Sequence, residues 1–149
     1  MVLSALEVLG YLRTINPSYD VITLQKILYY SQCGSICVFK TELFSEPLVH
    51  WAHGPTVERV YSALKKKQPI EFNPDQIEEK FAKLIRLTAE FWTKYSSMES
   101  RTHFQASQPW ISTNRNDVIT VENIVNNFGQ EKQEKEFLSV LQKRLHAFI

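Results

Sequence analysis

The stretch Thr23–Gln32, TLQKILYYSQ, has the residue spacing of an amphipathic helix. Its inner face consists of Leu24, Ile27, Leu28 and Ser31. Thr23 is placed to cap the first turn, and we expect the helix to continue past Gly34 as far as Phe39. Neighbouring residues on a helix point about 100° apart. We therefore expect one ring of the Tyr29-Tyr30 pair in the core and the other at least partly exposed.

Helices are also predicted on both sides of this stretch. Ser4 and Glu7 form a capping box for a first helix. Asn16-Pro17 ends that helix, because a residue before proline avoids the α region. A longer helix is expected to begin at Asn73-Pro74, with an apolar face repeating over about five turns. That face consists of Ile77, Phe81, Leu84, Ile85, Thr88, Phe91, Trp92 and Tyr95.

The second half of the chain is predicted to hold three further helices, over 96–103, 120–128 and 131–148. The first has the serine and glutamate spacing of a capping box. The second is followed by Gly129, which suits the position just after a helix end. The polar segment 104–117 is predicted to be a loop.

One short run, Leu48–Ala52, favours a β-strand. Gly54-Pro55 closes it, and we expect Pro55 to be the first residue of the next helix. Trp51, Gly54 and Pro55 would then form a rigid strand-to-helix corner. The predicted fold class is mainly α: a compact single-domain helical bundle over residues 1–149, with about six to seven helices and at most one small β element.

The composition is that of an ordinary globular domain. The chain has 149 residues, of which 44% are hydrophobic and 22% are charged, and its net charge is +1. A charge this small gives no strong attraction to nucleic acid or to anionic lipid. No signal peptide or long apolar run is recognised. Cys33 and Cys37 are too few for a disulfide framework. We therefore expect a cytoplasmic protein with reduced cysteines and no membrane partner.

A zinc site is one alternative that the sequence raises. Cys33 and Cys37 are followed by His50 and His53, close to a two-Cys, two-His spacing. The final gap is one residue too short, the cysteines fall within a predicted helix, and the core is large enough to fold without metal. A cysteine nucleophile with a histidine base, Cys37 with His50 or His53, is a second alternative. We favour the interpretation that Cys33 and Cys37 are two small apolar side chains on a helix over the zinc site and the cysteine nucleophile.

Other signals of catalysis are weak. The chain has no phosphate-binding glycine loop, no dinucleotide fingerprint and no zinc protease helix. The Glu78-Glu79 pair and the basic run Lys65-Lys66-Lys67 are interpreted as solvated helix positions. We therefore predict no enzyme activity, no catalytic residues, no metal and no cofactor.

Several separated blocks together resemble the Panacea domain of bacterial and phage antitoxins, also described as SocA-like. The first is Thr23–Gln32, and the second is Trp51–Val57 (WAHGPTV) with Val60-Tyr61 after it. The third is Thr102-His103 with Pro109-Trp110 after it. Residues 118–128 resemble the closing helix of the family. The resemblance thus covers about residues 23–128, and the helix over 130–149 is expected to be particular to this protein.

The resemblance implies a set of motif positions, either structural or toxin-binding. They are Lys26, Tyr29, Tyr30, Trp51, Gly54, Pro55, Tyr61, His103 and Trp110. The chain departs from the family pattern at Cys33 and Thr56 and in a longer gap between His103 and Trp110. We expect a structural role for His103 and leave Lys26 open between an internal hydrogen bonder and a recognition residue. Trp51 is expected to be a large buried aromatic whose loss unfolds the domain.

The function that the resemblance implies is that of an antitoxin that neutralises a cognate protein toxin by direct binding. Specificity is then expected in the segment 104–116 and in the last helix. One alternative is a proteolytic adaptor that delivers its toxin to a cellular protease. Another is a DNA-binding regulator of its own operon, although the long helix mixes Lys80, Lys83 and Arg86 with acidic residues.

Overall fold

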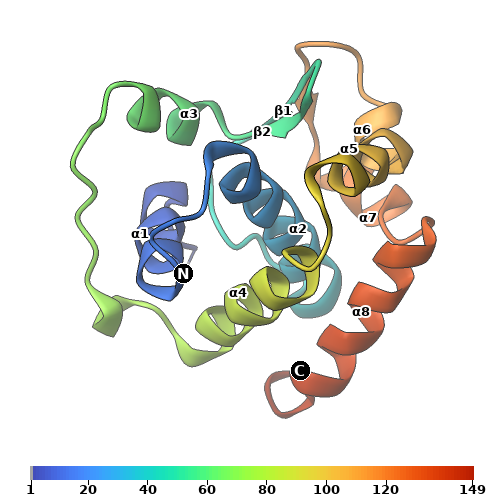
Figure 1. Cartoon of the computed structure of the whole chain (residues 1–149). Coiled ribbons are helices and arrows are strands. Elements are labelled where there is room, and N and C mark those ends of the chain that lie inside the picture. Colours follow the sequence, from blue (N-terminus) through green and yellow to red (C-terminus); the bar gives the residue numbers. More distant parts are fainter. Residues whose placement is uncertain (1) are drawn as a thin grey trace.

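Helix α2 (Val21–Phe39) runs through the middle of the molecule, and the other elements surround it (Figure 1). The computed structural model describes residues 2–149. The helix passes through Gly34 and ends at Phe39, as predicted. It begins earlier than predicted, because Asp20 and not Thr23 is the N-cap: the Asp20 carboxylate accepts a hydrogen bond from the Thr23 N–H at 2.8 Å.

Both tyrosines of the Tyr29-Tyr30 pair are fully buried, so the prediction that one would be exposed was wrong. The Tyr30 ring stacks on Trp92, with centroids 3.6 Å apart and planes 6° from parallel. The Tyr29 hydroxyl lies 2.6 Å from Ser107 Oγ. Adjacent rings can both be buried here because α2 has packed neighbours on opposite sides.

Two buried glutamines of α2 hold neighbouring segments by their main chain. The Gln25 amide donates to the Val57 carbonyl oxygen at 3.1 Å and accepts from the Val57 N–H at 2.9 Å. The Gln32 amide donates to the Phe44 carbonyl oxygen at 2.8 Å and accepts from the Leu43 N–H at 2.7 Å. Each amide thereby forms hydrogen bonds with buried main-chain groups of a segment that packs against α2.

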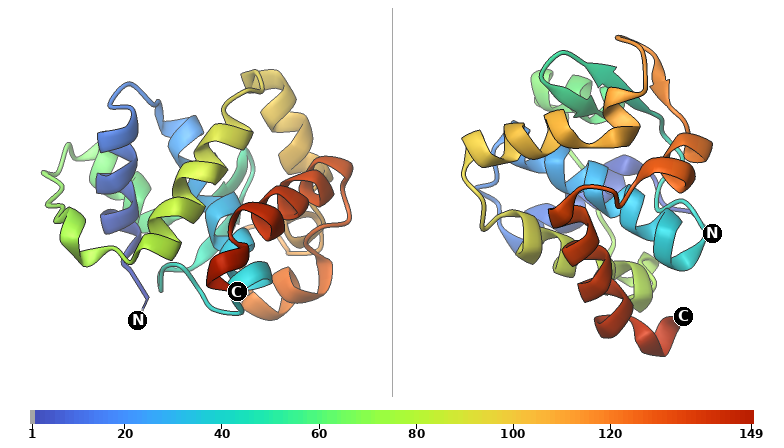
Figure 2. Two further views of the ribbon diagram at one scale, coloured as in Figure 1. Left: turned by 90° about the horizontal axis from the view of Figure 1, so that it is seen from below. Right: turned by 90° about the vertical axis from the view of Figure 1, so that its right-hand side faces the viewer.

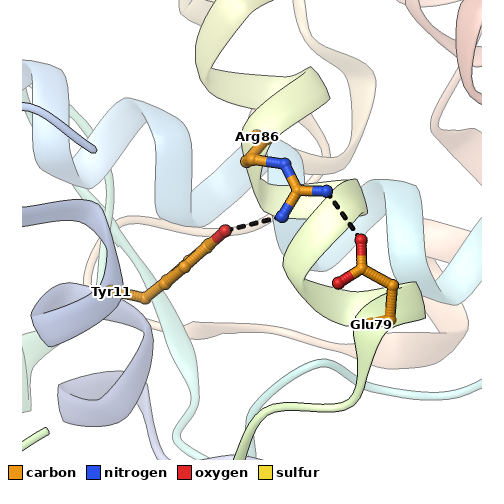
Figure 3. A network of polar contacts seen from close by, with 3 residues as sticks. All are labelled: Tyr11, Glu79 and Arg86. Carbon is orange, nitrogen blue, oxygen red and sulfur yellow. Dashed lines mark hydrogen bonds and ion pairs between the residues drawn. The ribbon is translucent and has the colours of Figure 1, made fainter. Parts of the chain in front are cut away.

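Helices α1 (Ala5–Ile15), α3 (Glu58–Lys65) and α4 (Glu79–Trp92) lie on one side of α2 (Figure 1). The capping box of α1 is formed as predicted. A short 3-10 turn, Pro74–Gln76, precedes α4, so the long helix starts later than the predicted Asn73-Pro74. Arg86 of α4 contacts Glu79 at 2.7 Å and Tyr11 of α1 at 2.8 Å (Figure 3). This exposed network helps to align α1 with α4, although such surface pairs contribute little stability.

The β element is a three-stranded antiparallel sheet of order β2-β1-β3, made of Leu48–Trp51 (β1), Gly54–Thr56 (β2) and Val118–Ile119 (β3). Pro55 pairs with His50 in this sheet and does not start a helix, which corrects the prediction. Proline is tolerated because β2 is an edge strand. Helix α3 begins only at Glu58, after Val57, which Gln25 holds in an extended conformation.

The remaining helices are α5 (Ser97–Ala106), α6 (Gln108–Ile111), α7 (Val121–Asn127) and α8 (Lys132–Arg144), followed by a 3-10 turn at His146–Phe148. The predicted loop over 104–117 was partly wrong, because it contains the end of α5 and all of α6. The Thr120 cap and the position of Gly129, with φ at +97°, agree with the prediction. The predicted class is confirmed: the fold is mainly α, with eight α-helices among the described residues.

Helix α8 packs closely on α2 and α4 (Figure 2). A Cβ atom placed on Gly34 would lie 2.7 Å from Leu141 Cδ1, so the glycine allows this close approach. None of the helices within residues 2–149 is long and apolar enough to cross a membrane.

A buried polar network joins α2 to α8. The fully buried Glu134 carboxyl group accepts from Ser107 Oγ at 2.6 Å and from the Gly129 N–H at 2.9 Å, and Ser107 also contacts the Tyr29 hydroxyl. Desolvation raises the pKa of Glu134 to about 7. Between about pH 4.5 and 7 this carboxyl group therefore retains a proton that an exposed glutamate would lose.

The first prediction concerns the pH dependence of stability. Between about pH 4.5 and 7 the unfolded chain ionises Glu134 while the folded protein keeps it protonated, so its contribution to the free energy of unfolding falls as the pH rises. Glu134→Gln removes this loss and can retain both hydrogen bonds. Relative to wild type, the variant should gain about 2–3 kcal/mol between pH 5 and pH 8 in urea denaturation.

The matched control is Glu136→Gln, which removes the same charge from an exposed position of α8. Its stability should follow that of the wild type across this pH range. Parallel stability curves for Glu134→Gln and wild type would show that Glu134 is ionised in the folded protein.

Candidate functional site

The motif positions implied by the family resemblance fall into two groups. Lys26, Tyr29, Tyr30, Gly54, Pro55 and His103 are buried, whereas Trp51, Tyr61 and Trp110 are partly exposed. The contacts of Tyr29 and Tyr30 described above are all internal. We therefore looked for a binding surface around the other positions.

The β1–β2 hairpin is held to α6 by aromatic contacts. The His50 ring stacks on Trp110 with centroids 4.1 Å apart, and its Nδ1 lies 2.7 Å from the Trp110 carbonyl oxygen. The Trp110 Nε1–H donates to the Trp51 carbonyl oxygen at 3.4 Å. Trp110, one of the motif positions, thereby holds the sheet against α6. Its position in the sequence does not reveal this role.

Trp51 and Gly54 shape the same corner from β1 and β2. The Trp51 ring is only partly buried and packs edge-on against Tyr61, with centroids 5.0 Å apart. The expectation of a buried Trp51 was therefore wrong, and the partial exposure of its ring does not support the prediction that its loss unfolds the domain. Gly54 has φ at +140°, and a Cβ atom there would lie 3.1 Å from the Phe104 ring, so this position requires glycine.

Lys26 is buried, with 3% of its surface exposed, although it carries a cation. Its ammonium group donates a short hydrogen bond to Ser100 Oγ on α5, and it lies 6.0 Å from the centroid of the Tyr95 ring. Desolvation lowers the pKa of Lys26 to about 8. Lys26 is therefore a buried ammonium group with a single hydrogen-bond acceptor among the described residues, and that acceptor is neutral.

A cavity of about 350 Å³ opens over Lys26 between the start of α2 and the start of α5. The remaining lining residues are mostly polar: Asn16, Tyr19, Ile22, Thr23, Thr93, Tyr95, Ser97 and Ser100. Ile22 also lines two smaller hollows, of about 90 and 40 Å³, that reach the β1–β2 hairpin. The three hollows therefore lie next to Ile22 at the start of α2.

This region carries apolar side chains on its surface. Val21 and Ile22 are 43% and 56% exposed at the first turn of α2. The partly exposed Tyr61 and the exposed His53 and Arg101 line the smaller hollows beside them. We define the α2 corner surface as the cavity over Lys26 together with the residues Val21, Ile22, His53, Tyr61 and Arg101.

His103 is buried beside this surface, and the structural role expected for it stays a prediction. Its ring packs against Tyr95 at 4.6 Å and Trp92 at 5.6 Å between centroids. Burial lowers the pKa of His103, which favours the neutral imidazole. Its Nδ1 has no hydrogen-bond partner among residues 2–149.

The geometry gives no support to the zinc and cysteine alternatives. Within residues 2–149 there is no group of three or more Cys, His, Asp or Glu side chains that could hold a metal ion. Burial raises the pKa of the Cys33 and Cys37 thiols, which disfavours the nucleophilic thiolate. The His50 ring is already engaged by Trp110.

Sequence reasoning singled out Lys26 as a polar residue in an apolar block, but it missed the partners. Ser100 and Tyr95 lie about 70 residues further along the chain, and no spacing rule connects them to α2. The exposed Val21 and Ile22 were missed because the helix was expected to begin after them.

The second prediction tests whether Lys26 is kept for stability. At pH 7 its charge is present in both the folded and the unfolded protein, and burial penalises it only in the folded one. Lys26→Met fills similar volume without a charge, and Ser100 keeps its bond to the Ser96 carbonyl oxygen. The variant should therefore be more stable than wild type by about 1–2 kcal/mol in urea denaturation at pH 7.

This advantage should shrink above pH 8, where the folded wild type begins to release the proton of Lys26. The exposed Lys94 nearby provides a matched control, because Lys94→Met removes the same charge without relieving any burial. A Lys26→Met variant that is destabilised by more than about 1 kcal/mol would instead assign Lys26 a structural role.

Comparison with known families agrees with the motif blocks. The model of the family described as "Antitoxin SocA-like, Panacea domain" matches residues 24–146. The match extends beyond Phe128 and includes α8. No curated protein and no solved structure matches the chain. Since the family model covers most of the 149 residues, the chain belongs to the SocA-like antitoxins that contain a Panacea domain.

Proposed function

We propose that this protein neutralises a cognate protein toxin by binding it directly, and that it acts in the cytoplasm without catalysing a reaction. Family membership supports the antitoxin role. We further propose that the α2 corner surface contacts the toxin. The observation that carries this choice is the combination of exposed apolar residues with three hollows that share Ile22, the largest of which is lined by the buried cation Lys26.

The α2 corner surface has the properties of a protein-binding site. Exposed apolar side chains beside pockets are what a partner covers when it binds. The surface also sits on the first turn of α2, whose remaining length is fixed in the core, so little conformational entropy is lost when it is covered. Tyr61 and Arg101 are of the residue types that most often dominate binding energies.

A second exposed apolar area lies at α7, where Val121 and Val125 line a cavity of about 450 Å³ next to the end of α2. No buried charged residue lines this cavity within the described part of the chain. We therefore rank it below the α2 corner surface and use it as the control. Val125 is 60% exposed, close to the 56% of Ile22.

For the third prediction, the candidate toxin is the protein encoded by the neighbouring gene. The test is the growth of cells that express this protein. That protein alone should arrest growth, and co-expression of the antitoxin should restore it. Ile22→Glu should abolish the rescue, because it places a charge in the centre of the contact and is expected to cost at least about 2 kcal/mol of binding energy. Val125→Glu should rescue as well as wild type.

The two variants should have the same stability as wild type within about 0.5 kcal/mol, because both positions are exposed. Rescue by Ile22→Glu together with failure of Val125→Glu would move the toxin-binding surface to α7.

Purified toxin that stays inhibited by the antitoxin with no protease present would distinguish direct neutralisation from delivery to a protease.

A further inference from the structure

The ammonium group of Lys26 has unused hydrogen-bonding capacity. It carries three N–H donors, and Ser100 Oγ is its only hydrogen-bond acceptor among the described residues. The only ion pair within residues 2–149 is the one between Arg86 and Glu79. A buried cation that lacks a carboxylate partner is costly, and proteins generally retain such a group for binding or catalysis.

The two acidic residues whose charges act on Lys26 are Glu99 and Asp20, and both form hydrogen bonds elsewhere. The Asp20 carboxylate caps α2 by accepting from the Thr23 N–H at 2.8 Å. The Glu99 carboxylate closes the capping box of α5 by accepting from the Ser96 N–H at 3.0 Å. Either residue would lose its cap by turning towards Lys26, so the fold itself does not supply a partner for the ammonium group.

The cavity over Lys26 suits a single negative charge. Among the described residues that line it, none is acidic, and Thr23, Ser97 and Ser100 contribute hydroxyl groups. Thr23 and Ser97 lie in the first turns of α2 and α5, where the helix dipoles are positive. Asp20 and Glu99 already occupy these helix ends, and the Lys26 ammonium group is the one positively charged side chain that lines the cavity among the described residues. A single ammonium group balances the charge of a carboxylate better than the nearly double charge of a phosphate.

We propose that this cavity receives an aspartate or glutamate side chain of the toxin, whose carboxylate pairs with the Lys26 ammonium group. The inference rests on the proposed function, since it names the group by which the toxin is recognised. A carboxylate entering the cavity from the direction of Ile22 would be surrounded by the apolar contact of the α2 corner surface. The pair would then be shielded from water, where a charged contact is strong and specific.

If a toxin carboxylate pairs with Lys26, toxin binding should depend on the protonation of Lys26. A lysine with a purely structural role would not give this dependence. The titratable groups around Lys26 are Asp20, Tyr19, Tyr95, Glu99 and His103. In the free protein the pKa of Lys26 is about 8, and pairing with a carboxylate would raise it. Toxin binding by wild type should therefore strengthen roughly tenfold as the pH falls from 9 to 7.

The experiment measures the dissociation constant of the purified neighbouring-gene protein by calorimetry, for wild type, Lys26→Met and Lys94→Met. Lys26→Met should weaken binding by about 30-fold or more and remove the pH dependence, because the toxin carboxylate would be left unpaired. Lys94→Met should change binding by less than about fivefold. The pH profile of wild type requires no variant, and Lys26→Gln provides a second substitution if Lys26→Met does not fold.

Alanine replacement of each Asp and Glu of the toxin then identifies the occupant. One of these changes should weaken binding to wild type and have no further effect on binding to Lys26→Met. Unchanged affinity of Lys26→Met in a stable complex would overturn the inference and leave the proposed function intact. Absence of any complex would overturn the proposed function and the occupant with it.

An added arm uses inorganic phosphate alone. If phosphate raises the melting temperature of wild type but not of Lys26→Met, and no acidic toxin residue is coupled to Lys26, the cavity is a site for a free anion. That result would overturn the assignment to a toxin side chain.

Discussion

The burial of α2 on every side between Leu24 and Ile36 is the constraint on which the rest of the structure depends. A helix in this position cannot leave its buried polar groups to water, so most of them need a partner inside the protein. Among the described residues, only the Tyr30 and Ser31 hydroxyls and a few other buried side-chain groups lack one. Gln25 and Gln32 meet this requirement by binding the main chain at Val57 and at Leu43 and Phe44. The same contacts therefore satisfy α2 and fix the segments that lead to the sheet and to α3.

Lys26 differs from the other buried polar residues of α2 because it carries a charge. The amides of Gln25 and Gln32 are matched in both donor and acceptor, whereas the Lys26 ammonium group has one neutral acceptor and no ion pair within the described residues. Glu134 is also buried, but with a pKa of about 7 it keeps its proton below neutral pH and carries no charge there. Lys26 remains charged at pH 7 despite a pKa lowered to about 8, and it does so where a cavity reaches the surface.

Sequence periodicity predicted the helical class because most helices of this fold have one apolar face and recognisable caps. It failed where tertiary contacts decide the outcome. Tyr30 is buried because α4 and α8 supply Trp92 and Phe137 from distant parts of the chain. Pro55 is in a strand because Gln25 and the sheet hold the residues after it. For the candidate site, the motif indicated Lys26, but its partners on α5 and the cavity depend on how two helix ends meet, which local spacing does not encode.

This arrangement separates stability from recognition along a single helix. The middle of α2 is fixed by aromatic packing against Trp92, by the glutamines and by the close contact of Gly34 with α8. The first turn contributes exposed residues that few internal contacts constrain, so Val21 and Ile22 can change without disturbing the core. A scaffold built this way can be adapted to different partners by altering the rim around one fixed cation. The cation then provides the common polar contact, and the rim determines which protein reaches it.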